Sequence, residues 1–371
     1  MAASSFTADY LLRVCQPYLD PHLVAPAARP LIQAIARQLP SVSGLVLECR
    51  LEANAPAVDF IPRFNRFDGS DQFFINRSLY PDAADPHPIW SRIHHFYRHW
   101  CDPQNTLLNQ NVLDTWLEFD LDGGGSALPL PSFYTGKVGL HGIGPAMYTT
   151  ERMPRAADHL PVAEAILGLL FGGPVPAAVW SSVGKLYEAL PPGAIPFAIG
   201  MMLPRTQTAA RFVIIGLPAD QIGAFLSRAG WPGDLDALQR VTAALSPFTD
   251  RIAVSLDVGH TLSRQVGLEC FLSEYNPQKE PRWSQFVHYL VEGGLCTPEK
   301  GRAILAWYGH FTLTPSLPHS LTPLPIFRRE ISHLKVVYRP DGSLAAKGYL
   351  EMRVTRKAPA TKVATLKAYT D

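Results

Sequence analysis

Hydrophobic and polar residues alternate along residues 331–354, on both sides of an Arg-Pro-Asp-Gly turn at 339–342. Leu334 and Val336 share one face of the first run, and Lys347 and Tyr349 share one face of the second. Successive side chains of a strand point to opposite faces, and Pro-Asp-Gly is a typical turn sequence. The stretch therefore predicts a β-hairpin with one apolar and one polar face.

The same unit recurs four times earlier in the chain, with helical periodicity between the hairpins. The expected strand pairs are 44–52 with 58–67, 115–122 with 131–138, 197–203 with 210–217, and 251–259 with 265–272. Apolar residues at helical spacing predict helices within 7–38, 89–100, 162–171, 177–190, 219–229, 235–245, 281–291 and 297–307. Residues 68–88 are rich in Asp, Pro and Asn, which favours a loop.

The order of these elements restricts the architecture. Helices that lie between hairpins can cover only one face of a sheet, so the apolar alternants must face them. Closing the sheet would remove its unpaired edges. We therefore expect an α+β fold of about ten antiparallel strands, arranged as five hairpins with helices on one face and closed as an αββα-type barrel. An open, strongly twisted sheet is the alternative. We expect one domain over 1–354 (or two halves, 1–150 and 151–354), followed by a basic, flexible tail at 355–371.

In a closed barrel the polar alternants would line the lumen, where they are candidates for ligand binding. This prediction covers nine residues: Glu48, Arg50, Glu118, Asp120, Lys137, Asp257, Glu269, Lys347 and Tyr349. Glu118, Asp120 and Asp122 form an acidic ladder suited to a peptide amine, a Lys or Arg side chain, or a divalent ion. The solvated face of an edge strand would show the same pattern, so both interpretations stay open.

Composition excludes several functional classes. The 371 residues are 47% hydrophobic and carry a net charge of +1, so no global field attracts nucleic acid or an anionic membrane. No run of about 18 apolar residues predicts a membrane span. The N-terminus lacks the features of a signal peptide, and the five cysteines are scattered without a CxxC pair. These features are typical of a cytoplasmic protein with reduced thiols.

Two histidine patterns suggest chemistry but have simpler interpretations. His95 and His99 are four residues apart on a predicted helix, which is metal-ligand spacing, yet no HExxH motif is present. We interpret them as a surface pair beside an aromatic helix face. Asp257 and His260 resemble a base and its orienting group, although a histidine in a turn is the preferred interpretation. The sequence thus assigns no metal site, no cofactor and no catalytic residue.

The expected topology resembles the barrel of the aromatic prenyltransferases, in which five αββα units enclose a central chamber. Those enzymes hold a prenyl diphosphate with Lys, Arg and Tyr at alternating strand positions, and Lys347-Gly348-Tyr349 matches that pattern once. The middle hairpins depart from it, because they carry Met201, Met202, Val213, Ile215, Ser255 and Asp257 where further cations would be expected. A diphosphate needs several cations, so this resemblance supports only an alternative function.

A second resemblance concerns sequence segments. Residues 115–123 (TWLEFDLDG), 267–272 (GLECFL), 289–300 (YLVEGGLCTPEK) and 331–350 are similar to the peptide-binding proteins of crocagin biosynthesis. Those proteins act with partner enzymes to convert a ribosomal precursor peptide into a pyrroloindoline alkaloid. The resemblance implies a protein that binds a precursor peptide and assists its modification or cyclisation, with pathway enzymes as partners and without a cofactor of its own.

Three functional hypotheses follow. The first is a peptide-binding or accessory protein of bacterial natural-product biosynthesis, holding the peptide in the lumen or at a sheet edge. The second is an aromatic prenyltransferase-like enzyme acting on an indole or a peptide. The third is a cyclase or isomerase that uses Glu118 or Asp257 with Lys347. We favour the first, so the chain is interpreted as a non-enzyme. A homodimer is compatible with the sequence but is indicated by no motif.

Overall fold

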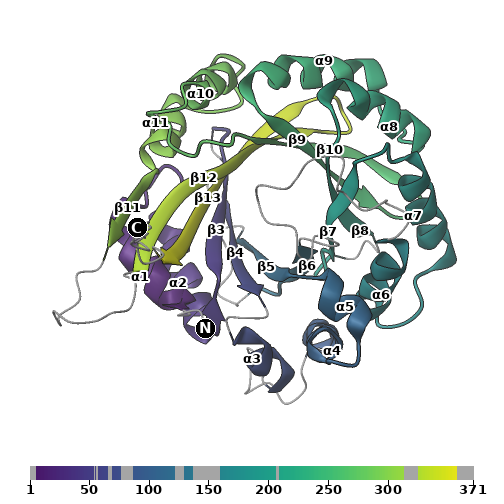
Figure 1. The fold of residues 1–371 in the computed structure, drawn as a ribbon. Helices are drawn as coiled ribbons and strands as arrows, with labels where there is room; N and C mark the ends of the chain where they lie inside the picture. The colour runs from purple at the N-terminus through teal and green to yellow at the C-terminus, as the bar shows by residue number, and fades with distance from the viewer. Residues whose placement is uncertain are drawn as a thin grey trace, which may run out of the picture.

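A computed structural model describes residues 6–53, 55, 57–65, 69–76, 87–121, 129–136, 159–205, 209–312 and 325–356. Ten of its strands form a closed antiparallel barrel (Figure 1). They are β3 (Gly44–Arg50), β4 (Val58–Asn65), β5 (Asp114–Leu121), β6 (Ser132–Gly136), β7 (Ile195–Met201), β8 (Ala210–Ile215), β9 (Arg251–Val258), β10 (Leu262–Phe271), β12 (Pro325–Tyr338) and β13 (Leu344–Arg356). Neighbours follow the order β10-β9-β8-β7-β6-β5-β4-β3-β13-β12, and pairing of β12 with β10 closes the ring. The predicted α+β barrel of five hairpins is confirmed.

Three short strands lie outside the ring. β1 (Phe6–Thr7) pairs with β2 (Ser41–Val42), and β11 (Gly309–Thr312) extends one end of β12. Closure of the barrel gives each of its ten strands a neighbour on both sides. Among the described residues of the 11-stranded sheet, only the four-residue β11 has an open edge. Main-chain pairing with a guest peptide therefore has little backbone available to it in this part of the chain.

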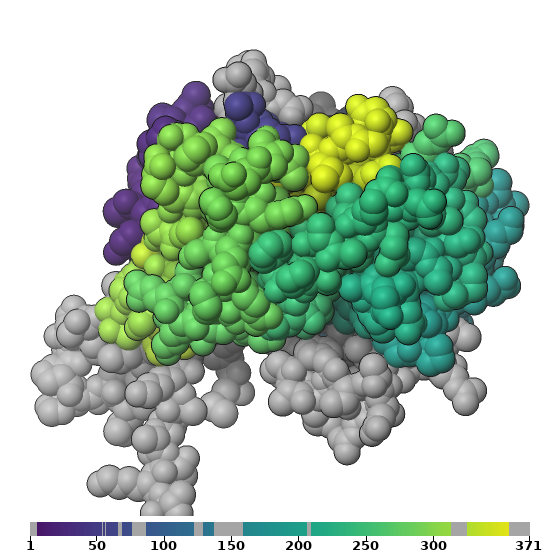
Figure 2. Space-filling view, turned by 90° about the horizontal axis from the view of Figure 1, so that it is seen from above, coloured from purple at the N-terminus to yellow at the C-terminus, as the bar shows by residue number. Residues whose placement is uncertain are grey.

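Helices surround the barrel on its outer side (Figure 1). The described residues form α1 (Ala8–Cys15), α2 (Arg29–Gln38), α3 (Ser70–Asn76), α4 (Pro88–Cys101), α5 (Thr106–Asn111), α6 (Leu160–Phe171), α7 (Ala177–Ala189), α8 (Ile222–Arg228), α9 (Leu235–Leu245), α10 (Arg282–Glu292) and α11 (Pro298–Ala306). The apolar alternants of the strands, such as Leu45 and Leu47 of β3, are buried against them. Figure 2 shows part of this helical coat from outside, with the yellow β12–β13 segment emerging beside α10 and α11.

The expected loop at 68–88 was wrong over residues 70–76, and residues 77–86 lie outside the described part of the chain. Residues 68–88 include α3, whose Phe74 lies 4.9 Å from Phe64 of β4 and 4.4 Å from Tyr97 of α4, measured between ring centroids. The helix is too short and too polar to show periodicity, so packing of its aromatic rings on the barrel and on α4 determines it. The short helix α5 was missed for the same reason.

The ends of the barrel are of two kinds. All five hairpin turns lie at one end, here called the turn end, because consecutive strands are antiparallel; the helical connections leave from the other end, the helix end. The predicted Pro-Asp-Gly turn joins β12 to β13 with Gly342 at φ +82°, a conformation that glycine adopts readily. The predicted start of α11 is also confirmed, since the Thr297 hydroxyl accepts a hydrogen bond from the Lys300 amide.

Candidate functional site

The inward faces of the strands build a lumen with an apolar plug between two polar layers. On β4 the inward residues are Asp59, Ile61 and Arg63, so an apolar residue separates two charged ones. Ile61 packs with Val46 and Tyr349, which lie on the neighbouring strands β3 and β13, and Trp116 of β5 lies against this cluster. We call this cluster the plug; along the strands it lies between charged side chains towards the turn end and charged side chains towards the helix end.

Aromatic stacking completes the plug. Trp116 stacks on Tyr134 with ring centroids 5.9 Å apart, and Tyr349 stacks on His333 at 4.0 Å. Inward glycine makes room for these rings: a Cβ at Gly200 would lie 2.1 Å from the Tyr134 ring. A glycine inside a strand weakens it, so its use here indicates that the large ring must fit.

The layer towards the helix end is a set of ion pairs. Arg63 contacts Glu351 at 2.8 Å and Asp114 at 3.3 Å, and Arg353 contacts Glu330. Arg328 also lies 3.6 Å from Glu330, so three arginines balance three carboxylates and we interpret this layer as structural.

The layer towards the turn end contains three carboxylates that converge. Glu48, Asp59 and Glu118 each present a carboxylate oxygen within 4.8 Å of the other two. The register explains this, because Glu48 lies directly opposite Asp59, and Asp59 opposite Asp120, one inward position from Glu118. Glu48 is 3% exposed and Asp59 is 1% exposed. We call these three residues the carboxylate triad.

Six cations in and around the same layer pair with six carboxylates. The pairs are Lys347–Glu48, Arg50–Asp59 (3.5 Å), Lys335–Glu269 (3.0 Å), Arg211–Asp257 (2.7 Å), Arg205–Asp120 (3.2 Å) and Arg339–Glu52 (2.7 Å). Among the described residues Glu118 has no such pair, and the Oδ1 atom of buried Asp59 has no hydrogen-bond partner. Carboxylates therefore exceed cations in this layer of the described chain.

This excess changes the protonation of the triad. Burial raises the pKa of Asp59 to about 9, with the charge of Glu48 adding to the effect. Burial and Glu48 likewise raise the pKa of Glu118 to about 7. Burial also opposes ionisation of Glu48, but Lys347, Lys335 and a hydrogen bond from Tyr349 more than offset it, so the pKa of Glu48 lies below its usual range. At neutral pH Glu48 is therefore ionised, and Asp59 holds a proton.

A cavity of about 240 Å³ occupies this layer. It is lined by Arg50, Asp59, Glu118, Arg205, Arg211, Ser255, Leu256, Asp257, Gln265, Gly267, Lys335, Val337, Arg339, Ala345 and Lys347. Arg205 and Arg339 lie next to hairpin turns, so the cavity reaches the turn end of the barrel. Its lining is largely polar, which suits a polar or charged guest.

The structure brings most of the sequence-predicted residues into this layer. Arg50, Glu118, Asp257 and Lys347 line the cavity, and Glu48 completes the triad. Asp120 pairs with Arg205, and Glu269 pairs with Lys335. Tyr349 belongs to the plug, where it also bonds Glu48. Lys137 and Asp122 lie outside the described residues.

Several residues of the site were missed. Asp59, Arg211 and Lys335 occupy inward strand positions, and the alternation of Val58, Asp59 and Phe60 would have indicated the first of them. Arg205 and Arg339 lie beside turns, where no periodicity places a side chain.

The structure supports the simpler interpretation of the Asp257–His260 pattern, in which His260 is a histidine in a turn. Asp257 accepts two hydrogen bonds from Arg211, at 2.7 and 3.0 Å, and His260 lies exposed in the turn after β9. A carboxylate held by a guanidinium on both oxygens is a poor base. Glu118 is therefore the better candidate for proton transfer in this layer.

The carboxylate triad is also the one group of three metal-ligating residues among the described side chains that converges closely enough for an ion. An all-oxygen donor set suits Mg²⁺, Ca²⁺ or Mn²⁺. The Lys347 ammonium already bonds Glu48 within the cluster, so a metal would have to share or displace it. The donor set fits an added ammonium or guanidinium group at least as well.

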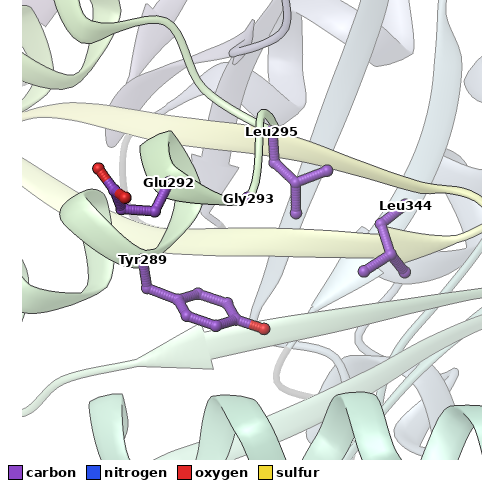
Figure 3. A pocket seen from close by; sticks show the side chains of 5 residues that line it. All are labelled: Tyr289, Glu292, Gly293, Leu295 and Leu344. Carbon is purple, nitrogen blue, oxygen red and sulfur yellow. The ribbon is translucent and has the colours of Figure 1, made fainter.

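A second hollow lies on the outer surface, at the end of α10 beside the start of β13 (Figure 3). Its volume is about 390 Å³, and Tyr289, Glu292, Gly293, Leu295 and Leu344 line it. Figure 3 shows the Glu292 carboxylate on the far side from the tyrosine hydroxyl, so the polar groups do not converge. We assign no chemistry to this hollow.

Comparisons with known proteins give no family for this chain. No protein-family model matches it, and no curated protein matches it with significant similarity. Among the described residues, none of the helices has the length and apolar character needed to cross a membrane.

Proposed function

We propose that this protein binds a precursor peptide, or a peptide-derived substrate, through an amine that enters the turn-end layer of the lumen. In this role it assists the modification or cyclisation of the peptide in a bacterial natural-product pathway. The observation that carries the proposal is the carboxylate triad: three converging carboxylates, with one oxygen of Asp59 unpartnered and with Glu118 outside the ion pairs of the described chain. A bound ammonium would take the place of the proton that Asp59 holds at neutral pH.

The size of the cavity supports insertion of one residue rather than of a whole peptide. At about 240 Å³ it is smaller than pockets that bury drug-sized ligands, roughly 300–1,000 Å³. A terminal residue or a single side chain fits such a volume. The rest of the peptide would lie across the turn end, where Arg205, Arg339 and Gln265 offer hydrogen-bond donors.

Glu118 gives the proposed site a reactive group. A base works best when its pKa is near the working pH, and the pKa of Glu118 is raised to about 7. Glu118 would accept a proton from the bound ammonium and leave a neutral amine that can attack an electrophile. Glu48, whose pKa lies below its usual range, would stay ionised and offset the charge of the bound ammonium.

An aromatic prenyltransferase-like activity is the second candidate. The five-hairpin barrel and the six cations around the cavity favour it. Each of those cations is already paired with a carboxylate, so a diphosphate would have to displace several of these partners. For this reason the amine-binding proposal is preferred.

The two candidates respond in opposite ways to one substitution. Lys347→Met removes the ammonium that bonds Glu48 of the triad, so it should weaken binding of a prenyl diphosphate and leave binding of a peptide amine equal or stronger. Isothermal titration would compare dimethylallyl diphosphate with synthetic peptides from candidate precursors encoded near the gene, each with a free and an acetylated N-terminus. We expect the free amine to bind at least tenfold more tightly. Equal affinity of free and acetylated peptides, for Lys-free sequences, would reject the proposal.

A further inference from the structure

A pair of histidines on the outer face of α4 forms a second candidate site, which is separate from the lumen. His95 is exposed and His99 is half-buried, and the helix places them four residues apart on one face. Their rings stack with centroids 4.7 Å apart, and their Nε2 atoms lie 2.8 Å from each other. The two Nε2 atoms are therefore close enough for one ion to contact both.

The distance between the two nitrogens matches a particular coordination geometry. If a metal formed bonds of about 2.0–2.1 Å to both Nε2 atoms, the angle between the two bonds would be roughly 85–90°. Cu²⁺ and Ni²⁺ prefer such right angles in square-planar or tetragonal sites, whereas tetrahedral Zn²⁺ would require the rings to separate. Imidazole is a good ligand for both of these ions.

We propose that His95 and His99 bind one Cu²⁺ or Ni²⁺ ion as a two-nitrogen chelate. The metal takes the place of the single proton that the two Nε2 atoms share in the hydrogen bond. Within the described chain no third His, Cys, Asp or Glu joins the pair, so water would fill the remaining positions. The carboxylate of Asp102, one turn further on, accepts a hydrogen bond from the Gln104 amide.

The position on the helix assists a cation. α4 ends at Cys101, so His99 lies in its last turn, where the unpaired carbonyl groups give a partial negative charge. Arg98 lies in the same turn and opposes this effect.

Titration calorimetry of the untagged full-length protein with CuCl₂, and separately with NiCl₂, tests the inference. We expect one ion per chain, and a loss of affinity of at least tenfold in both His95→Ala and His99→Ala. Zn²⁺ should bind more weakly than Cu²⁺. The matched control is His288→Ala, which removes an exposed histidine of α10 that has no histidine four residues away, and which should leave the affinity unchanged.

Circular dichroism would verify that each variant is folded, which we expect because His95 is exposed and His99 is only half-buried. Electron paramagnetic resonance of the copper complex should show two nitrogen ligands. The inference is overturned if the wild-type chain takes up no ion, or if both histidine variants bind copper as tightly as the wild type.

Discussion

Replacing Asp59 by asparagine should stabilise the protein, although it alters a buried charged residue. Asp59 is 1% exposed, and burial beside Glu48 raises its pKa to about 9. In the unfolded chain the pKa of an aspartate is about 3.9. Between these values the folded state binds one more proton than the unfolded state, so this carboxyl group destabilises the fold increasingly as the pH rises from about 4 towards 9. Asparagine resembles the protonated carboxyl group and titrates in neither state.

The magnitude follows from the two pKa values. A pH of 7 lies about three units above the pKa of Asp59 in the unfolded chain. At this pH the buried carboxyl group therefore lowers the free energy of unfolding by about 4 kcal/mol. Asp59 is protonated at pH 7, so a weakened hydrogen bond from Arg50, 3.5 Å away, rather than a lost ion pair would reduce the gain, by about 1 kcal/mol. Asp59→Asn should therefore stabilise the ligand-free protein by about 3 kcal/mol at pH 7.

Guanidinium unfolding at several pH values would measure this effect. The advantage of the variant should grow by about 1.4 kcal/mol per pH unit between pH 5 and 8. Asp257→Asn is the matched control, because its carboxylate is held by Arg211 on both oxygens; this substitution should destabilise by about 2–3 kcal/mol. If Asp59→Asn destabilises the fold at pH 8 as much as the control does, the carboxylate is well compensated and our description of the triad is wrong.

Three further predictions concern the barrel and its thiols. Gly200→Ala should destabilise by at least about 2 kcal/mol in denaturant unfolding, because the new methyl group would lie 2.1 Å from an aromatic ring of the plug, whereas Gly184→Ala, with open space around it on α7, should not destabilise. Lys335→Met should cost about 3–5 kcal/mol, since it leaves buried Glu269 without the ammonium 3.0 Å away; unchanged stability would show that the pair is solvated. A thiol reagent should label at most Cys101 in the native protein, because the other four cysteines are buried; rapid labelling of more than one thiol would contradict the packing.

The fold could be predicted from the sequence because its signal is local and repeated. Alternation at 331–354 and in four earlier segments identified the five hairpins, and nine of the helices coincide with the apolar periodicity between them. Closure was inferred from the cost of open edges rather than read from any residue. The contact that achieves it, β10 with β12, joins segments whose pairing no local pattern specifies.

The site was predictable only in part, for a related reason. Strand alternation places Glu48 and Glu118 on the inward face, but it does not state which residues of different strands meet at one level of the barrel. That level depends on the stagger of the strands, which brings Asp59 rather than Asp120 into the triad. The effect of burial on the protonation of these groups could not be predicted without knowing which carboxylates meet at the same level of the barrel.

The most direct test of the account is the proton balance of peptide binding. Titration calorimetry at pH 6.5, in two buffers of different ionisation enthalpy, would follow binding of a peptide whose free N-terminal amine is already protonated at that pH. A bound ammonium lowers the pKa of neighbouring carboxyl groups, so we predict that binding releases protons and that Asp59→Asn reduces the number released. Binding without proton release, or release that is identical in the variant, would contradict an amine held by the carboxylate triad.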